Sequence, residues 1–167
     1  LRYASPEHRV NRYLAIDPEQ SAAIDPRQNT QRFIGGVTLD YQPLAWLGII
    51  GTAGMDVVDR HDNELIPPAT VFFSSLPEGE RTSNRIRIGN YTANLGATAN
   101  YPLSESIQAT TSIGTQYNEE IFRGTYAFGA GLLAGSGSLE GTTHLYSVGE
   151  ENDQLRTLGG YFQQQVA

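Results

Sequence analysis

Apolar and small polar residues alternate along the stretch from Tyr91 to Tyr117. It reads YTANLGATANYPLSESIQATTSIGTQY, and two runs with a period of two flank a short turn at Pro102–Ser106. This pattern predicts a β-hairpin. The only charged residue in the stretch is Glu105, which falls in the turn. Because the wet face of a soluble sheet normally carries Lys, Glu or Asp, the uncharged polar face is typical of a transmembrane β-barrel strand pair.

The tyrosines of this hairpin give it a length that can be compared with a membrane. Tyr91 and Tyr101 are ten residues apart, which is about 33 Å along a strand at roughly 3.3 Å per residue. A tilt of about 45° reduces this to roughly 23 Å of height, close to the ~25 Å apolar band of membrane barrels. The spacing therefore predicts a membrane-spanning strand with an aromatic residue at each interface.

A second hairpin follows the same plan earlier in the chain. Residues Gln31–Gln42 alternate, a short turn follows at Pro43–Ala45, and Trp46–Arg60 reads as the returning strand. Leu155–Ala167 reads as a last strand. Aromatic residues cluster beside both turns, as an interfacial aromatic belt would.

The segments between these strands read as long loops. His61–Thr82 is rich in proline and acids, and Gly124–Gln154 is rich in glycine. Leu1–Thr30 is predicted to be mainly a loop, with a weak short strand at Arg9–Ile16 and a possible helix around Pro18–Ile24. Alternation of short turns with long loops is the layout of outer-membrane barrels, whose periplasmic turns are short and extracellular loops long.

Composition narrows the class further. The chain has 167 residues, of which 39% are hydrophobic, and it contains 18 Gly. A net charge of −7 argues against a nucleic-acid partner. The chain contains no Cys, so disulfides, Cys–Zn sites and thiol catalysis are excluded. The sequence contains no apolar run of about 18 residues, so no transmembrane helix is predicted. Because the sequence starts at Leu1 and not at Met, we expect it to be a piece of a longer protein.

The segment NTQRFIGGVTLDYQPLAWLGIIGTAGMDVVDR resembles the barrel of SusC/RagA-type TonB-dependent outer-membrane transporters. In that family an Arg-Phe-x-Gly-x-x-x-Leu-x-Tyr strand, a turn ending in Trp-Leu and a Gly-x-Asp strand follow one another. The Tyr-Pro-Leu-Ser turn and the closing GGYFQQQVA are also similar to this family, so the resemblance runs over roughly Asn29–Ala167. The positions that match the motif are Arg32, Phe33, Gly35, Leu39, Tyr41, Trp46, Leu47, Gly54 and Asp56.

The resemblance implies a fold, a place and partners. The fold is all-β: an antiparallel transmembrane β-barrel segment, a meander of about five or six strands from a plugged barrel of about 22 strands. Residues 1–30 would be an extracellular loop segment and residues 31–167 part of the barrel. The whole protein would sit in the bacterial outer membrane, contact its lipid, receive energy through TonB, pair with a SusD-like lipoprotein and import glycans or peptides. Neither catalysis nor a cofactor is expected.

The polar face of the 91–117 hairpin supplies the candidate binding residues. Their amide and hydroxyl groups would line the barrel lumen, where they hydrogen-bond a passing sugar or peptide, the plug, or only water. These residues are Thr92, Asn94, Thr98, Asn100, Gln108, Thr110, Ser112 and Gln116.

Other chemistry has weaker support. Four acids could supply oxygens to Ca²⁺, although the EF-hand spacing is absent: Asp56, Asp59, Asp62 and Glu64. His8, His61 and His144 fall in predicted loops, and no GxSxG or HExxH motif accompanies them. Gly129, Gly131 and Gly135 form GxGxxxG, which is not the dinucleotide fingerprint and is interpreted as a flexible loop.

Three other classes remain open at this point. A soluble β-sandwich, such as a carbohydrate-binding module, would explain the alternation and the turns, but not the nearly charge-free strands. A small complete outer-membrane barrel of about eight strands, acting as an adhesin or structural protein, would need the loops to supply further strands. A β-rich hydrolase would need an acid–base constellation that the sequence does not display.

Overall fold

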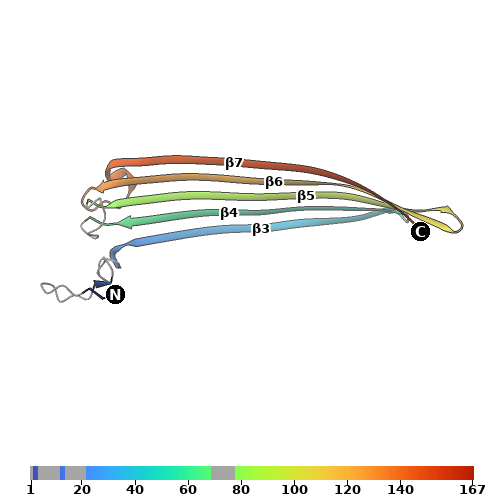
Figure 1. Cartoon of the computed structure of the whole chain (residues 1–167), viewed down its shortest axis with the longest axis horizontal. Helices are drawn as coiled ribbons and strands as arrows, with labels where there is room; N and C mark the ends of the chain where they lie inside the picture. The colour runs from blue at the N-terminus through green and yellow to red at the C-terminus, as the bar shows by residue number, and fades with distance from the viewer. Residues whose placement is uncertain (1, 4–11, 14–21, 69–77) are drawn as a thin grey trace. The chain divides into compact units, whose positions relative to one another are not determined.

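The computed structural model describes residues 2–3, 12–13, 22–68 and 78–167. Its main feature is a five-stranded sheet in which each strand bonds to its neighbours in the chain, in the order β3-β4-β5-β6-β7 (Figure 1). The strands are β3 (Asp25–Leu44), β4 (Leu47–Ile66), β5 (Glu80–Ser104), β6 (Ile107–Leu132) and β7 (Thr142–Val166). The all-β antiparallel meander that the sequence predicts is therefore confirmed.

Three short elements complete the described fold. β1 (Arg2–Tyr3) and β2 (Arg12–Tyr13) pair antiparallel, with Arg2 opposite Tyr13. A 3₁₀ turn, η1 (Leu139–Gly141), precedes β7. No helix in the described part of the chain is long and apolar enough to cross a membrane.

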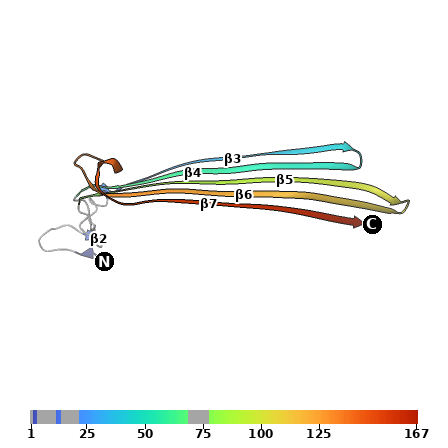
Figure 2. The ribbon, with the colours of Figure 1, turned by 90° about the horizontal axis from the view of Figure 1, so that it is seen from above.

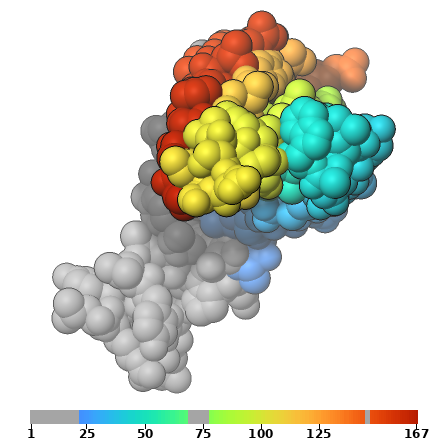
Figure 3. Space-filling view, turned by 90° about the vertical axis from the view of Figure 1, so that its right-hand side faces the viewer, coloured from blue at the N-terminus to red at the C-terminus, as the bar shows by residue number. Residues whose placement is uncertain are grey.

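The chain divides into two compact units, and each strand of the main sheet contributes residues to both. We call residues 1–30, 59–86 and 124–151 the loop unit, and residues 31–58, 87–123 and 152–167 the hairpin unit. The hairpin unit holds both tight turns. Figure 3 shows their ends side by side, β3–β4 in cyan and β5–β6 in yellow.

The tight turns are shorter than the sequence predicts. Residues 45–46 and 105–106 alone form them, whereas the sequence predicts a turn over Pro102–Ser106. The Asn100 N–H donates to the Trp46 carbonyl at 2.8 Å. The next N–H that would point from β5 toward β4 is that of residue 102. It lies beyond the first residue of β4, Leu47, so the missing N–H of Pro102 removes no hydrogen bond between the two strands. Pro102 is thus compatible with a strand here.

The strands also reach much further than predicted, and this corrects the two long loops. β6 continues to Leu132 and β7 starts at Thr142, within the expected loop 124–154. β4 and β5 extend likewise into the expected loop 61–82, and β3 begins at Asp25 instead of Gln31. The prediction failed because glycine in 124–154, and proline and acidic residues in 61–82, were taken as signs of a loop.

The glycines of β6 instead allow close contacts with neighbouring segments that a side chain would block. A Cβ on Gly129 would lie 2.8 Å from Thr142 Oγ1, and Gly131 has a φ of +72°. The Gly131 N–H donates to the Gly79 carbonyl at 3.0 Å, which ties the end of β6 to the start of β5. Such close approach and positive φ are open to glycine at low cost.

The N-terminal predictions are only partly covered by the structure. β2 lies within the predicted strand Arg9–Ile16, and the other residues of that prediction lie outside the described residues. Ala22 and Ala23 are helical, while residues 18–21 of the predicted helix also lie outside them.

The described sheet has almost no core of its own. Its buried hydrophobic residues are Ala109, Ala130 and Leu132, and no large side chain among the described residues is fully buried. The side chains of such a sheet must be covered by something other than this chain or else face solvent. The chemistry of the two faces of the hairpin unit therefore indicates what each face contacts.

Candidate functional site

One face of the hairpin unit is apolar and exposed. Alternate residues of β3 and β5, together with Ile113 of β6, present large hydrophobic side chains that are 36–67% exposed. These residues are Phe33, Val37, Leu39, Tyr41, Leu95, Tyr101, Leu103 and Ile113. Contiguous exposed apolar patches of this kind mark a surface that faces lipid or another protein.

The opposite face joins neighbouring strands through uncharged polar side chains. Asn94 Nδ2 donates to Thr52 Oγ1 at 3.0 Å. Thr98 and Ser112 share a hydrogen bond between their hydroxyls at 3.1 Å, and Thr110 Oγ1 donates to Asn100 Oδ1 at 2.7 Å. The structure thus brings together several of the predicted lumen-facing residues on one face.

The other predicted lumen residues make fewer contacts. Thr92 Oγ1 would lie 3.1 Å from a Cβ on Gly54, which places it on the same face as Thr52. Gln116 lines a small pocket of about 220 Å³ together with Asn94 and Thr52, and the lining also includes apolar residues such as Ile50. Gln108 pairs through its backbone with Ala167, with bonds of 2.9 and 3.0 Å.

An aromatic side chain on this polar face was missed by sequence reasoning. A Cβ on Gly114 would lie 2.5 Å from Tyr161 Cε1, and a Cβ on Gly96 would lie 3.1 Å from the Tyr161 hydroxyl. The ring of Tyr161 therefore crosses from β7 over β6 to β5, on a floor that two glycines leave open. Ile50 Cγ2 would be 3.6 Å from the same Gly96 Cβ. The only sequence signal was glycine at two interior strand positions.

Two stretches of the hairpin unit are poor in charged residues. Between Phe33 and Met55 the only charged residue is Asp40, and residues 157–167 contain none. Arg32, just before the first of these stretches, forms a two-bond ion pair with Asp56, just after it, at 2.9 and 2.6 Å. The first charge-poor stretch thus begins and ends beside one ion pair between adjacent strands.

A second bordering pair joins β6 to β7. Glu119 accepts hydrogen bonds from Arg156 Nε at 2.8 Å, from the Tyr117 hydroxyl at 3.0 Å and from the Gln154 amide. The bond from Arg156, and next the bond from Tyr117, hold the pKa of the Glu119 carboxyl below its ordinary value of 4.5. Glu119 is therefore an ionised, well-satisfied carboxylate at neutral pH.

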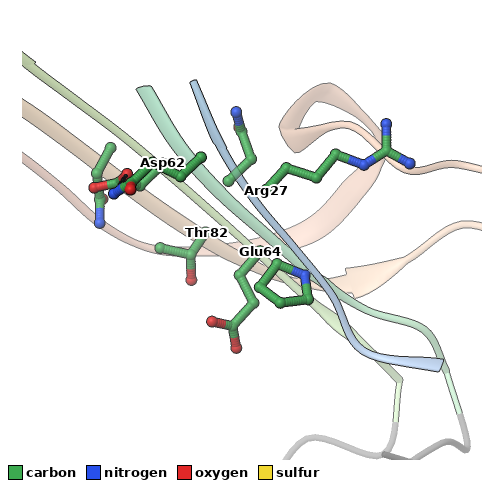
Figure 4. A pocket seen from close by; sticks show the side chains of 8 residues that line it. Arg27, Asp62, Glu64 and Thr82 are labelled. Carbon is green, nitrogen blue, oxygen red and sulfur yellow. Dashed lines mark hydrogen bonds between the residues drawn. The ribbon is translucent and has the colours of Figure 1, made fainter. Parts of the chain in front are cut away.

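The loop unit carries a polar pocket of about 270 Å³ on one face of three adjacent strands. Its lining includes Gln28 of β3, Asp62 and Glu64 of β4, and Thr82 of β5. Gln28 Nε2 donates to Asp62 Oδ1 at 2.7 Å. Figure 4 shows Arg27 extending away from Asp62 and Glu64; its guanidinium bonds instead to Asp25 at 2.7 Å. The pocket offers amides, a hydroxyl and two carboxylates to a polar ligand.

The structure does not bring together the four carboxylates of the candidate Ca²⁺ site, Asp56, Asp59, Asp62 and Glu64. Within the described residues no group of three His, Cys, Asp or Glu side chains could hold a metal ion. Asp59, an odd number of residues from Asp56, points to the other face of β4, where it lies 3.2 Å from Arg85. Asp62 and Glu64 share a face with Asp56, but an extended strand spreads the three along its length at about 3.3 Å per residue.

The remaining sequence motifs also lie on strands. His61 is in β4, where its Nε2 lies 3.1 Å from Ser83 Oγ, and His144 is in β7, 3.9 Å from a Glu78 carboxylate oxygen. Both histidines were predicted in loops, and that was wrong, whereas His8 lies outside the described residues. Among Gly129, Gly131 and Gly135, only Gly135 falls between strands.

Comparison with known proteins supports the fold. The chain is similar to chains in solved structures of the RagAB peptide transporter, with a TM-score of 0.81 and 15% sequence identity. Structures of the RagAB peptide importer in the "closed-closed" and "open-open" states give TM-scores of 0.76 and 0.75, also at 15% identity. Each comparison covers 99% of this chain and 18% of the other. No family model and no curated protein matches the sequence.

Proposed function

We propose that this chain forms part of the barrel wall of a SusC/RagA-type, TonB-dependent importer in the bacterial outer membrane. The observation that carries the proposal is the pair of unlike faces in the hairpin unit. One face exposes aliphatic and aromatic side chains such as Leu95, and the other bonds strand to strand through uncharged groups such as Asn94 and Thr52. A barrel strand needs this division, because one face meets lipid and the other meets an aqueous or plugged lumen.

The height of the charge-poor region agrees with the proposal. The segment Phe33–Leu44 has twelve residues between an ion pair and a tight turn, and a tilted membrane strand needs about 9–11. The bordering pairs Arg32–Asp56 and Glu119–Arg156 would then lie at the outer interface. The tight turns would be periplasmic, and the segments that join β4 to β5 and β6 to β7 would be extracellular.

The similar proteins support a proposal for the substrate and the partners. The neighbours are named as a peptide transporter, and amide and hydroxyl groups like those of the loop-unit pocket can hydrogen-bond a peptide or a glycan. We propose a large nutrient of this kind as cargo, TonB as the energy source and a SusD-like lipoprotein as the partner. The proposal assigns no catalytic step to the chain.

Fractionation and uptake together test this function. The protein that carries the chain is expected in the outer-membrane fraction, resistant to salt and urea washes and released only by detergent. Uptake of its nutrient is expected to cease when TonB is deleted. Recovery in the soluble fraction without detergent would overturn membrane residence, and undiminished uptake without TonB would overturn the mechanism.

A further inference from the structure

An apolar groove of about 500 Å³ runs across the exposed apolar face of the hairpin unit. Three strands supply its floor, which is made of small residues, and larger side chains form its walls. The floor residues are Gly35, Gly36, Ala53, Gly54 and Ala93. The walls are Phe33, Val37, Met55, Tyr91 and Tyr117, and Thr92 completes the lining.

The groove continues the apolar face and is not a separate site within the sheet. Phe33 and Val37 belong to the same exposed row of β3 as Leu39. Met55, 41% exposed, and Ala93, next to Leu95 in the outward row of β5, extend that row across the sheet. If this face meets lipid, the groove is a hollow in the lipid-facing wall.

One end of the groove is polar and carries an arginine. The wall residue Tyr117 donates its hydroxyl to Glu119 at 3.0 Å, and Glu119 accepts from Arg156 Nε at 2.8 Å. The Glu119 side chain is 16% exposed, whereas that of Arg156 is 61% exposed. The carboxylate is therefore covered while much of the guanidinium stays open to an anion, the geometry that favours phosphate contacts.

We propose that this groove holds one acyl chain of a lipid whose phosphate headgroup contacts Arg156. The inference rests on the proposed membrane location. An apolar channel that ends beside an exposed guanidinium and aromatic side chains matches the two parts of such a lipid, a hydrocarbon tail and an anionic head. The small floor residues let the chain lie close to the backbone, which increases the number of dispersion contacts.

Native mass spectrometry of the intact protein in mild detergent tests the inference. The wild-type protein is expected to retain one lipid per barrel after delipidation that removes loosely bound lipid. Ala93→Phe places a ring in the groove and is expected to abolish the retained-lipid peak. Ala97→Phe, on the same face of the same strand but outside the groove, is the matched control and is expected to keep it.

Two further variants sharpen the result. Val37→Trp fills the groove from β3, so it replaces Ala93→Phe if that variant fails to fold. Arg156→Gln is expected to weaken retention of phosphate-headgroup lipids by about tenfold while the groove stays intact. Re-addition of a glycerophospholipid or of lipopolysaccharide to delipidated protein then distinguishes the two sources of acyl chain and phosphate.

Each possible result either supports or overturns the inference. Retention in all variants, or equal loss in Ala93→Phe and Ala97→Phe, overturns the groove as the site. A dimer mass without lipid shows that a second copy covers it, which also overturns the inference. Wild-type protein that resides in the outer membrane but retains no lipid overturns the inference and leaves the proposed function standing, whereas a soluble protein overturns both.

Discussion

The hairpin unit and the loop unit are parts of the same five strands, but charged residues are distributed differently along the strands in each. In the hairpin unit the ion pair Arg32–Asp56 stands at the border of a segment whose interior holds only Asp40. In the loop unit, charged residues recur along the strands, as in the sequence from Asp59 to Glu64, and pairs such as Arg85–Asp59 join neighbouring strands. The same five strands run through both units, so we infer that the difference in charge reflects what surrounds each unit. Uncharged strands are suited to hydrocarbon, and strands with many exposed ion pairs are suited to water.

The largest expected effect comes from placing a charge on the exposed apolar face of the hairpin unit. Leu95→Arg is expected to lower the free energy of unfolding by about 2–4 kcal/mol in a bilayer, because the guanidinium would enter hydrocarbon. Thr125→Arg, at an exposed position of β6 in the loop unit, is expected to change it by less than about 0.5 kcal/mol. Urea unfolding in lipid vesicles measures both, and equal effects would erase the contrast between the units.

A smaller effect on stability is expected at the two glycines against which the ring of Tyr161 packs. A side chain at Gly114 would collide with that ring, so Gly114→Val is expected to cost about 1–3 kcal/mol, as overpacking does. Gly159, whose added Cβ would meet nothing within 4 Å, provides the matched control on β7. Gly159→Val is expected to be close to neutral. If both substitutions destabilise alike, strand propensity and not the ring is responsible.

The smallest effect concerns the bordering pair at Glu119. Because the folded-state pKa of Glu119 is lowered, its contribution to stability is present above pH 4.5 and is lost as pH falls through the folded value. Glu119→Gln is expected to reduce stability slightly at pH 7 and to flatten its pH dependence below pH 4.5. Unfolding midpoints between pH 7 and pH 3 measure this, and an unchanged pH profile in Glu119→Gln would contradict the assignment.

The sequence predicted the hairpin unit better than the loop unit, and the reason is physical. Alternation over Gln31–Gln42 and Tyr91–Tyr117 marks a strand whose two faces meet unlike surroundings. In the β6 segment 124–132 large and small residues alternate, but apolar and polar residues do not. Gly129 is set by its approach to Thr142. That contact depends on a residue of the next strand, and a local pattern does not contain it.

The candidate site shows the same limit. The polar face of β5 and β6 followed from alternation, and Thr98–Ser112 and Asn100–Thr110 share it as that pattern requires. Tyr161 was not predictable from its own segment, because its position depends on Gly114 and Gly96 in two other strands. Strand register, which fixes these partners, is not contained in either segment alone.

The central claim is that the two faces of the hairpin unit meet different solvents, and a cysteine scan along residues 91–101 tests it most directly. The chain has no Cys, so each position can be spin-labelled singly in the protein held in lipid bilayers. Labels at Leu95 and the other odd positions are expected to collide mainly with oxygen, which partitions into hydrocarbon. Labels at Asn94 and the other even positions are expected to collide less with oxygen. A period of two with this phase supports a lipid-facing wall, and equal oxygen accessibility at odd and even positions contradicts it.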